Sequence, residues 1–274
     1  MSTASPAMTP PDDIPAAISD LGVQKATLSL GAMIGLGVLA GAYIGVGSLM
    51  AALLGAGTAD LPHGIAQLVI GVGFAVGLIL VLLAGAELFT GNTLMTLPLA
   101  QRRIGAGQLL RAWCVVWLAN LVGALLLVLL AIGAGVPLAG DGAVAASAIE
   151  LAADKASKPA AGIVASGVLA NMLVCLAVWM AAGATSAVDK VAVIVPPIAA
   201  FVALGLEHSV ANMSLLPLGL LSAHGSGIEL PPGLTWTAAA GNLLWSTLGN
   251  IIGGAVIGLG YWAIHLRGAQ SSSE

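Results

Sequence analysis

Residues 201–215 read FVALGLEHSVANMSL and place an acid and an imidazole, Glu207 and His208, inside an otherwise apolar stretch. A similar pattern occurs earlier, because GAELFTGNTLM at 85–95 matches GLEHSVANMSL at 205–215 in having Gly-x-Glu followed five residues later by Asn. A second echo pairs ANLVGA at 119–124 with GNIIGGA at 249–255, in which Asn120 and Asn250 each stand three residues before a glycine. These echoes predict an internal repeat of two halves.

The composition indicates a membrane protein. Of the 274 residues, 59% are hydrophobic and only 7% are charged, which is too apolar for a soluble domain. Apolar runs of about 20 residues, long enough to cross the bilayer as helices, occupy 26–54, 65–86, 112–137, 160–184 and 236–264. A sixth run, 191–221, crosses only if a break at Glu207–His208 is tolerated. Because the runs are long and not alternating, we expect an all-α protein with six transmembrane helices instead of a β-barrel.

The repeat also predicts how the two halves are oriented. Each half holds three crossings, an odd number, so the halves are expected to be inverted relative to each other, with helices 2 and 5 broken. Irregular backbone at membrane depth is tolerated where it lines a cavity, and half-helix N-termini present free N–H groups. The two breaks therefore predict a midplane site that favours an anion.

Polar side chains at the breaks are the candidate site residues. We expect Glu87 and Glu207 to be structural, accepting backbone N–H groups that the breaks set free, with Asn92 and Asn212 in the same structural role. His208 is open to two interpretations, a satisfied interior histidine or a functional group, since ionisable side chains within spans are costly and usually face a pathway. Thr90 offers a hydroxyl in the matching break.

The cations predict the topology. With six crossings, both termini share one side, and six of the eight cations lie on that side, whereas Lys155 and Lys158 lie opposite. This bias predicts cytoplasmic termini. The six are Lys25, Arg102, Arg103, Arg111, Lys190 and Arg267.

Three segments follow from this topology. Residues 1–23 are expected to form a cytoplasmic N-terminal segment with a short interfacial helix over 14–22. Residues 24–266 are expected to form the six-helix transmembrane domain, and residues 267–274 a cytoplasmic tail.

The net charge of −4 gives no reason to expect a nucleic-acid partner. We also expect no metal and no cofactor, because the sequence carries none of the usual binding motifs.

An enzyme is the alternative from a different class. HGSG at 224–227 is similar to the Gly-x-Ser-Gly of intramembrane serine hydrolases. Ser226, however, falls in a polar loop, whereas that chemistry needs the nucleophile beside a histidine inside the membrane. We therefore expect no enzymatic activity.

Five segments in order resemble the signature segments of the formate–nitrite transporter family. They are GAELFTGNTLM, ANLVGA, GVLANMLVCLAVWM (167–180), GLEHSVANM and NLLWSTLGNIIGGA (242–255), and the resemblance covers residues 24–266. It implies an aquaporin-like fold, a homopentamer with one pore in each protomer, and a place in the bacterial cytoplasmic (inner) membrane. The implied partners are a small anion, protons, the lipid bilayer and further copies of the chain.

The resemblance also implies roles for individual residues. Thr90, His208 and Asn171 match the polar residues of the pore, and Lys155 matches a basic residue at the periplasmic mouth. The implied constrictions are Phe74 and Phe201 on the outer side, and Leu78 and Leu88 on the inner side with Phe89 beside them.

Branch features point to nitrite. GAELFTGNTLM, Trp245 and GLGYW at 258–262 look closer to the nitrite branch, with formate or hydrosulfide as alternatives. Apolar constrictions hinder a charged species. We therefore hypothesise that His208, oriented by Thr90 and aided by Asn171, donates or shares a proton so that the neutral acid passes. Histidine suits this role because it changes charge near neutral pH.

Overall fold

The computed structural model describes residues 8–58 and 60–267. Over these residues the protein is all-helical apart from turns, loops and one isolated bridge between Met8 and Ala184. The expectations for residues 1–7 and for residues 268–274 of the tail lie outside the described part of the chain.

Within residues 8–58 and 60–267, five helical segments are long and apolar enough to cross a membrane, at the places that the sequence predicted. The observed helix boundaries differ from the predicted ones where a capping residue fixes the end of the helix. For example, the first begins at Leu30 because the Ser29 hydroxyl accepts the Ala32 N–H at 3.2 Å. The five are α2 (Leu30–Ala56), α3 (His63–Phe74) continuing as α4 (Val76–Ala84), α7 (Ala106–Gly133), α9 (Ala160–Gly183), and α12 (Trp236–Tyr261) with the π-helical turn η3 (Trp262–Leu266).

The predicted sixth crossing consists of two shorter helices, α10 (Ala187–Ala203) and α11 (Ser209–Ser222), separated by residues 204–208. In the first half, α4 is likewise followed by irregular residues 85–88 and then by the short helices α5 (Phe89–Asn92), η1 (Thr93–Met95) and α6 (Thr96–Ala100). Gly85 (φ +79°) and Gly205 (φ +64°) are left-handed at the two breaks. Glycine adopts this conformation at no steric cost, which explains why the repeat keeps it.

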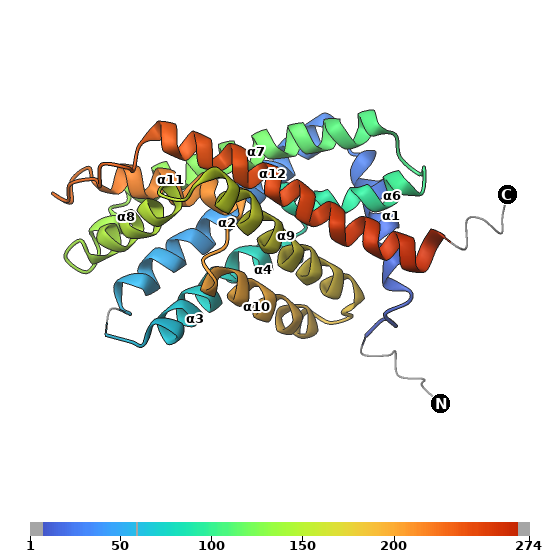
Figure 1. Cartoon of the computed structure of the whole chain (residues 1–274), viewed down its shortest axis with the longest axis horizontal. Helices are drawn as coiled ribbons and strands as arrows, with labels where there is room; N and C mark the ends of the chain where they lie inside the picture. Colours follow the sequence, from blue (N-terminus) through green and yellow to red (C-terminus); the bar gives the residue numbers. More distant parts are fainter. Residues whose placement is uncertain (1–7, 59, 268–274) are drawn as a thin grey trace.

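The flanking helices of each half pack in equivalent pairs, α2 against α7 and α9 against α12, the second pair running side by side in Figure 1. Glycines make the close approach possible. A Cβ at Gly41 would lie 1.9 Å from the Asn120 carbonyl oxygen, and one at Gly249 would lie 2.4 Å from the Val164 oxygen.

Two further helices lie at opposite ends of the bundle (Figure 1). Helix α1 (Ile14–Ala26) is longer than the predicted 14–22 and packs against α6, α7 and α9, with Ile14 and Ile18 buried against Leu97 of α6 and Trp179 of α9. Helix α8 (Ala143–Ala156), which follows the short η2 (Val136–Leu138), connects the two halves and packs against α11. The two helices bring cationic side chains to opposite ends of the protein.

Candidate functional site at the two helix breaks

The two breaks meet at a buried imidazole–hydroxyl pair. His208 precedes α11 and caps it, because its Nδ1 accepts the backbone N–H of Ala211 at 3.0 Å. Its Nε2 lies 2.8 Å from Oγ1 of Thr90. Since Nδ1 is occupied as an acceptor, we assign the proton of the neutral ring to Nε2, which donates to Thr90. The Thr90 hydroxyl then keeps its own hydrogen for another acceptor.

The backbone around His208 is held by the side chain of Asn250. Its Oδ1 accepts the Ser209 N–H at 2.7 Å, and its Nδ2 donates to the carbonyl oxygens of Gly167 (2.8 Å) and Glu207 (2.9 Å). Both neighbours of His208 are therefore fixed to α12 by one fully buried side chain.

Asn120 makes the same three hydrogen bonds in the first half. Its Oδ1 accepts the Phe89 N–H at 2.9 Å, and its Nδ2 donates to the oxygens of Gly37 (2.8 Å) and Glu87 (2.9 Å). The sequence analysis gives these two asparagines no role in the site. The signal for one is their echo, an asparagine three residues before a glycine in each half.

The carboxylate of Glu207 lies among cations and amides. Its oxygens accept from Lys158 at 2.6 Å and Lys155 at 3.4 Å, and from the side-chain amides of Asn212 (2.6 Å) and Asn242 (3.1 Å). Lys158 is the closer cation, although only Lys155 was among the expected site residues. Lys155 lies in α8, outside the long apolar helices, and burial lowers the pKa of its ammonium group against the opposing effect of Glu207.

Glu87 has the corresponding partners in the first half, with Lys25 Nζ at 2.7 Å and Asn92 Nδ2 at 2.8 Å. The expectation that Glu87 and Glu207 accept backbone N–H groups is therefore wrong. The adjacent amides of Phe89 and Ser209 are already taken by asparagine side chains, and buried carboxylates require cationic partners.

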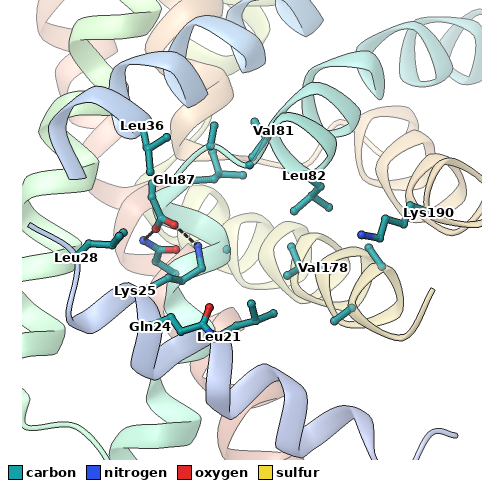
Figure 2. A pocket seen from close by; sticks show the side chains of 17 residues that line it. Leu21, Gln24, Lys25, Leu28, Leu36, Val81, Leu82, Glu87, Val178 and Lys190 are labelled. Carbon is teal, nitrogen blue, oxygen red and sulfur yellow. Dashed lines mark hydrogen bonds and ion pairs between the residues drawn. The ribbon is translucent and has the colours of Figure 1, made fainter. Parts of the chain in front are cut away.

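A cavity of about 350 Å³ lies beside the first break. We call it the Lys25 cavity; its lining includes Lys25, Glu87, Leu88 and Lys190. In Figure 2 the paired Lys25 and Glu87 stand on one wall, and the Lys190 ammonium points toward the space from the other. This end of the protein therefore offers ammonium groups around an apolar-walled opening.

A smaller cavity of about 100 Å³, the Lys155 cavity, lies beside the second break, and its lining includes Lys155, Lys158, Phe74, Phe201 and His208. The rings of Phe74 and Phe201 meet edge to face at 5.6 Å between centroids, and Phe201 is also 5.6 Å from the imidazole. No described residue lines both cavities. Residues 85–88 of the first break thus line one cavity, and Gly205, Leu206 and His208 of the second break line the other.

Like Thr90, three other expected residues line neither cavity. The Asn171 amide donates to the Thr90 carbonyl oxygen (3.3 Å) and makes no hydrogen bond to His208 within the described residues. Leu78 is buried in the core, and Phe89 packs edge to face with Trp113 at 6.3 Å. Of the residues expected at the inner constriction, Leu88 is the one that faces the Lys25 cavity.

Ser226 does not form a nucleophile–base pair. Its hydroxyl donates to the Ala223 oxygen at 3.4 Å in the loop after α11, and no bond to His224 occurs in the described part of the chain. The geometry needed for a serine hydrolase is absent there.

Known proteins match the chain along most of its length. Residues 12–263 match the protein-family model described as formate/nitrite transporter. The chain is 39% identical over 270 residues to the formate channel FocA of Escherichia coli strain K12, covering 93% of this chain and 95% of that protein. It is 39% identical over 245 residues to the nitrite transporter NirC of Salmonella typhimurium strain LT2, covering 88% and 82%.

A solved structure, a pentameric formate channel with formate bound, superposes with a TM-score of 0.78 at 32% identity, covering 87% of this chain and 98% of that one. The formate channel FocA matches over more residues than NirC at equal identity. The comparisons therefore do not favour the nitrite branch that the sequence features suggested.

Proposed function

The chain belongs to the formate/nitrite transporter family, whose members are membrane channels for small anions and not enzymes, and we propose that it conducts formate and nitrite. The observation that carries this proposal is the buried His208–Thr90 pair between two cavities that lysines line. The pair offers a polar group where we propose that an anion leaves its hydration shell.

Formate and nitrite are proposed together because two of the three branch features lie away from both cavities and because the two anions are chemically alike. Trp245 is 38% exposed on α12, and residues 258–262 form the end of α12 and the first residue of η3. Neither of these features lines a cavity, whereas the third, GAELFTGNTLM at 85–95, contributes Gly91 and Asn92 to the lining of the Lys25 cavity. Both anions are small and planar, and both spread one negative charge over two oxygens. The residues around His208 therefore give no reason to separate them.

Attraction to the cavities is the first step that we propose. Lys155 and Lys158 supply ammonium groups at one opening, and Lys25 and Lys190 supply them at the other. Such groups raise the local concentration of a small anion. The Phe74–Phe201 pair and Leu88 then oppose passage of a bare charge, because an apolar constriction does not replace lost water.

Proton sharing at the midplane is the second step. The Thr90 oxygen accepts the Nε2–H of His208, which leaves the Thr90 hydroxyl hydrogen to bond an oxygen of the anion. This hydrogen bond spreads part of the anion's charge onto the Thr90–His208 pair. Protonation of the anion by the pair requires a proton from solution to replace the one that leaves, so that the ring ends the step neutral, as it began. Adding a proton to Nδ1 would require the Ala211 hydrogen bond to break, so we propose the neutral ring with Nε2–H as the resting form.

Assembly and orientation complete the proposal. The likeness to a pentameric formate channel supports a homopentamer with one passage in each protomer. The excess of cations on the side of the termini supports a bacterial cytoplasmic membrane with both termini in the cytoplasm. The Lys25 cavity would then open to the cytoplasm and the Lys155 cavity to the outside.

Uptake into proteoliposomes tests the substrate assignment. We expect formate and nitrite uptake to exceed that of empty liposomes and to increase as the external pH falls, with hydrosulfide measured alongside. Chloride, a small anion without an accessible neutral acid, is the control and should stay near the empty-liposome rate. Chloride uptake equal to formate uptake, or no formate and nitrite uptake at all, would contradict the proposal.

A further inference from the structure

The two halves of the repeat allow a comparison between fold and function. Asn120 and Asn250 each bind the residue before and the residue after the corresponding position of their own break, with closely similar distances. That position holds Leu88 in the first half and His208 in the second. Holding the break is thus a task that both halves share, whatever the break contains.

The halves differ at the main-chain carbonyl of these asparagines. The Asn120 oxygen faces Gly41, where an added Cβ would lie only 1.9 Å away. In the second half, where Gly167 takes the place of Gly37 in the same hydrogen bond, the residue equivalent to Gly41 is Asn171. Its Nδ2 donates to the Asn250 oxygen at 2.6 Å.

Asn171 continues this connection to the other break. The same Nδ2 lies 3.3 Å from the Thr90 oxygen and 2.9 Å from Thr93 Oγ1. A chain of hydrogen bonds therefore runs from both neighbours of His208, through Asn250 and Asn171, to the backbone of Thr90. The first half has no equivalent chain in the described residues, since glycine occupies the matching position.

We propose that Asn250 is a positioning residue that joins the two breaks and fixes the 2.8 Å contact between His208 and Thr90. Its side chain sets the backbone on either side of the imidazole, and its carbonyl, through Asn171, sets the backbone of the hydroxyl partner. This inference rests on the proposed function insofar as the His208–Thr90 pair handles the substrate.

Packing leaves this chain little freedom. Asn250, Asn171 and Thr90 are fully buried, so water does not compete for their hydrogen bonds. A Cβ at Gly254 would lie 1.8 Å from Thr93 Oγ1 and 2.9 Å from Asn171 Nδ2, which shows that α12 lies directly against the connection. Small displacements of α12 would therefore be transmitted to both members of the pair.

Nitrogen-15 NMR of the histidine ring in the lipid-reconstituted protein reads this positioning directly. The His208 resonances are assigned by their absence in His208→Asn, and wild type should show an unprotonated, hydrogen-bonded Nδ1 and a protonated Nε2. We expect Asn250→Leu to shift both resonances and Asn171→Ala to shift Nε2 alone. Asn120→Leu, which removes the three matching hydrogen bonds from the other break, should leave Nδ1 unchanged.

Transport is the second readout. Formate flux per assembled protein should fall about tenfold in Asn250→Leu, which is the size of effect expected when a residue that orients a functional group is lost.

Two NMR outcomes would overturn the inference: wild-type His208 resonances in assembled Asn250→Leu, or an Nδ1 shift in Asn120→Leu equal to that in Asn250→Leu. If the leucine variant does not assemble, Asn250→Asp keeps the shape and the acceptor for Ser209, and it must still shift Nδ1; an unchanged Nδ1 would reject the proposal. Flux that does not depend on His208 would instead reject the proposed function and leave the NMR test of Asn250 intact.

Discussion

Replacing Glu207 by Gln should destabilise the protein strongly. The Glu207 side chain is fully buried with Lys158 at 2.6 Å and Lys155 at 3.4 Å, so the neutral amide would leave two ammonium groups without an anion. Removing one member of a buried ion pair costs about 3–5 kcal/mol. Lys158, which is 32% exposed, can turn toward water, whereas Lys155 at 12% cannot. We therefore expect Glu207→Gln to lower the free energy of unfolding by about 3 kcal/mol, the lower end of this range.

Glu87→Gln is the matched control, because Glu87 has one cationic partner, Lys25, which is 27% exposed. Its expected cost is about 1–2 kcal/mol, close to that of a hydrogen bond to a charged group. Unfolding in mixed detergent–SDS micelles, followed by tryptophan fluorescence, measures both free energies. A cost for Glu207→Gln no larger than that for Glu87→Gln would refute the reasoning.

A double substitution separates charge from packing. Lys155→Met should destabilise the wild type, since it removes a partner of Glu207, but it should stabilise Glu207→Gln by removing the buried ammonium group that cannot turn toward water. The same sign in both backgrounds would show that the lysines do not depend on the carboxylate.

Two further predictions concern packing and assembly. Gly41→Ala should greatly lower the yield of assembled protein in size-exclusion chromatography, because its Cβ would lie 1.9 Å from the Asn120 oxygen, whereas Gly107→Ala, with no atom within 4 Å, should behave as wild type; equal yields would contradict the close helix approach. Native mass spectrometry in mild detergent should show pentamers, and mainly monomers or trimers would argue against the proposed assembly.

The fold was largely predictable because membrane insertion imposes long apolar runs, and these correspond to the five long helices. The breaks were predictable because Gly85 and Gly205 repeat with their glutamates and asparagines, and the left-handed backbone at both positions explains why glycine is retained. Helix ends were less predictable, since caps such as Ser29 act through single hydrogen bonds that an apolar run does not reveal.

The partners within the site depended on contacts between distant segments. The Asn120 side chain donates a hydrogen bond to the carbonyl oxygen of Gly37, which is 83 residues away, and no local sequence pattern predicts such a bond. Lys158 is closer to Glu207 than Lys155 because the path of the chain after α8 decides which lysine reaches the carboxylate. The sequence does carry a signal for Lys25, because it precedes Lys155 by the same 130 residues that separate Asn120 from Asn250.

The most direct test of the central claim, that the His208–Thr90 pair handles the anion at the midplane, is the pH profile of formate and nitrite uptake from pH 5 to 8. It compares proteoliposomes of wild type, His208→Asn and Thr90→Ala, normalised to assembled protein. We predict that His208→Asn assembles, because asparagine is polar and no bulkier, but loses pH-dependent uptake, and that Thr90→Ala shows a weaker form of the same defect. Wild-type flux with a wild-type pH profile in well-assembled His208→Asn would contradict the account.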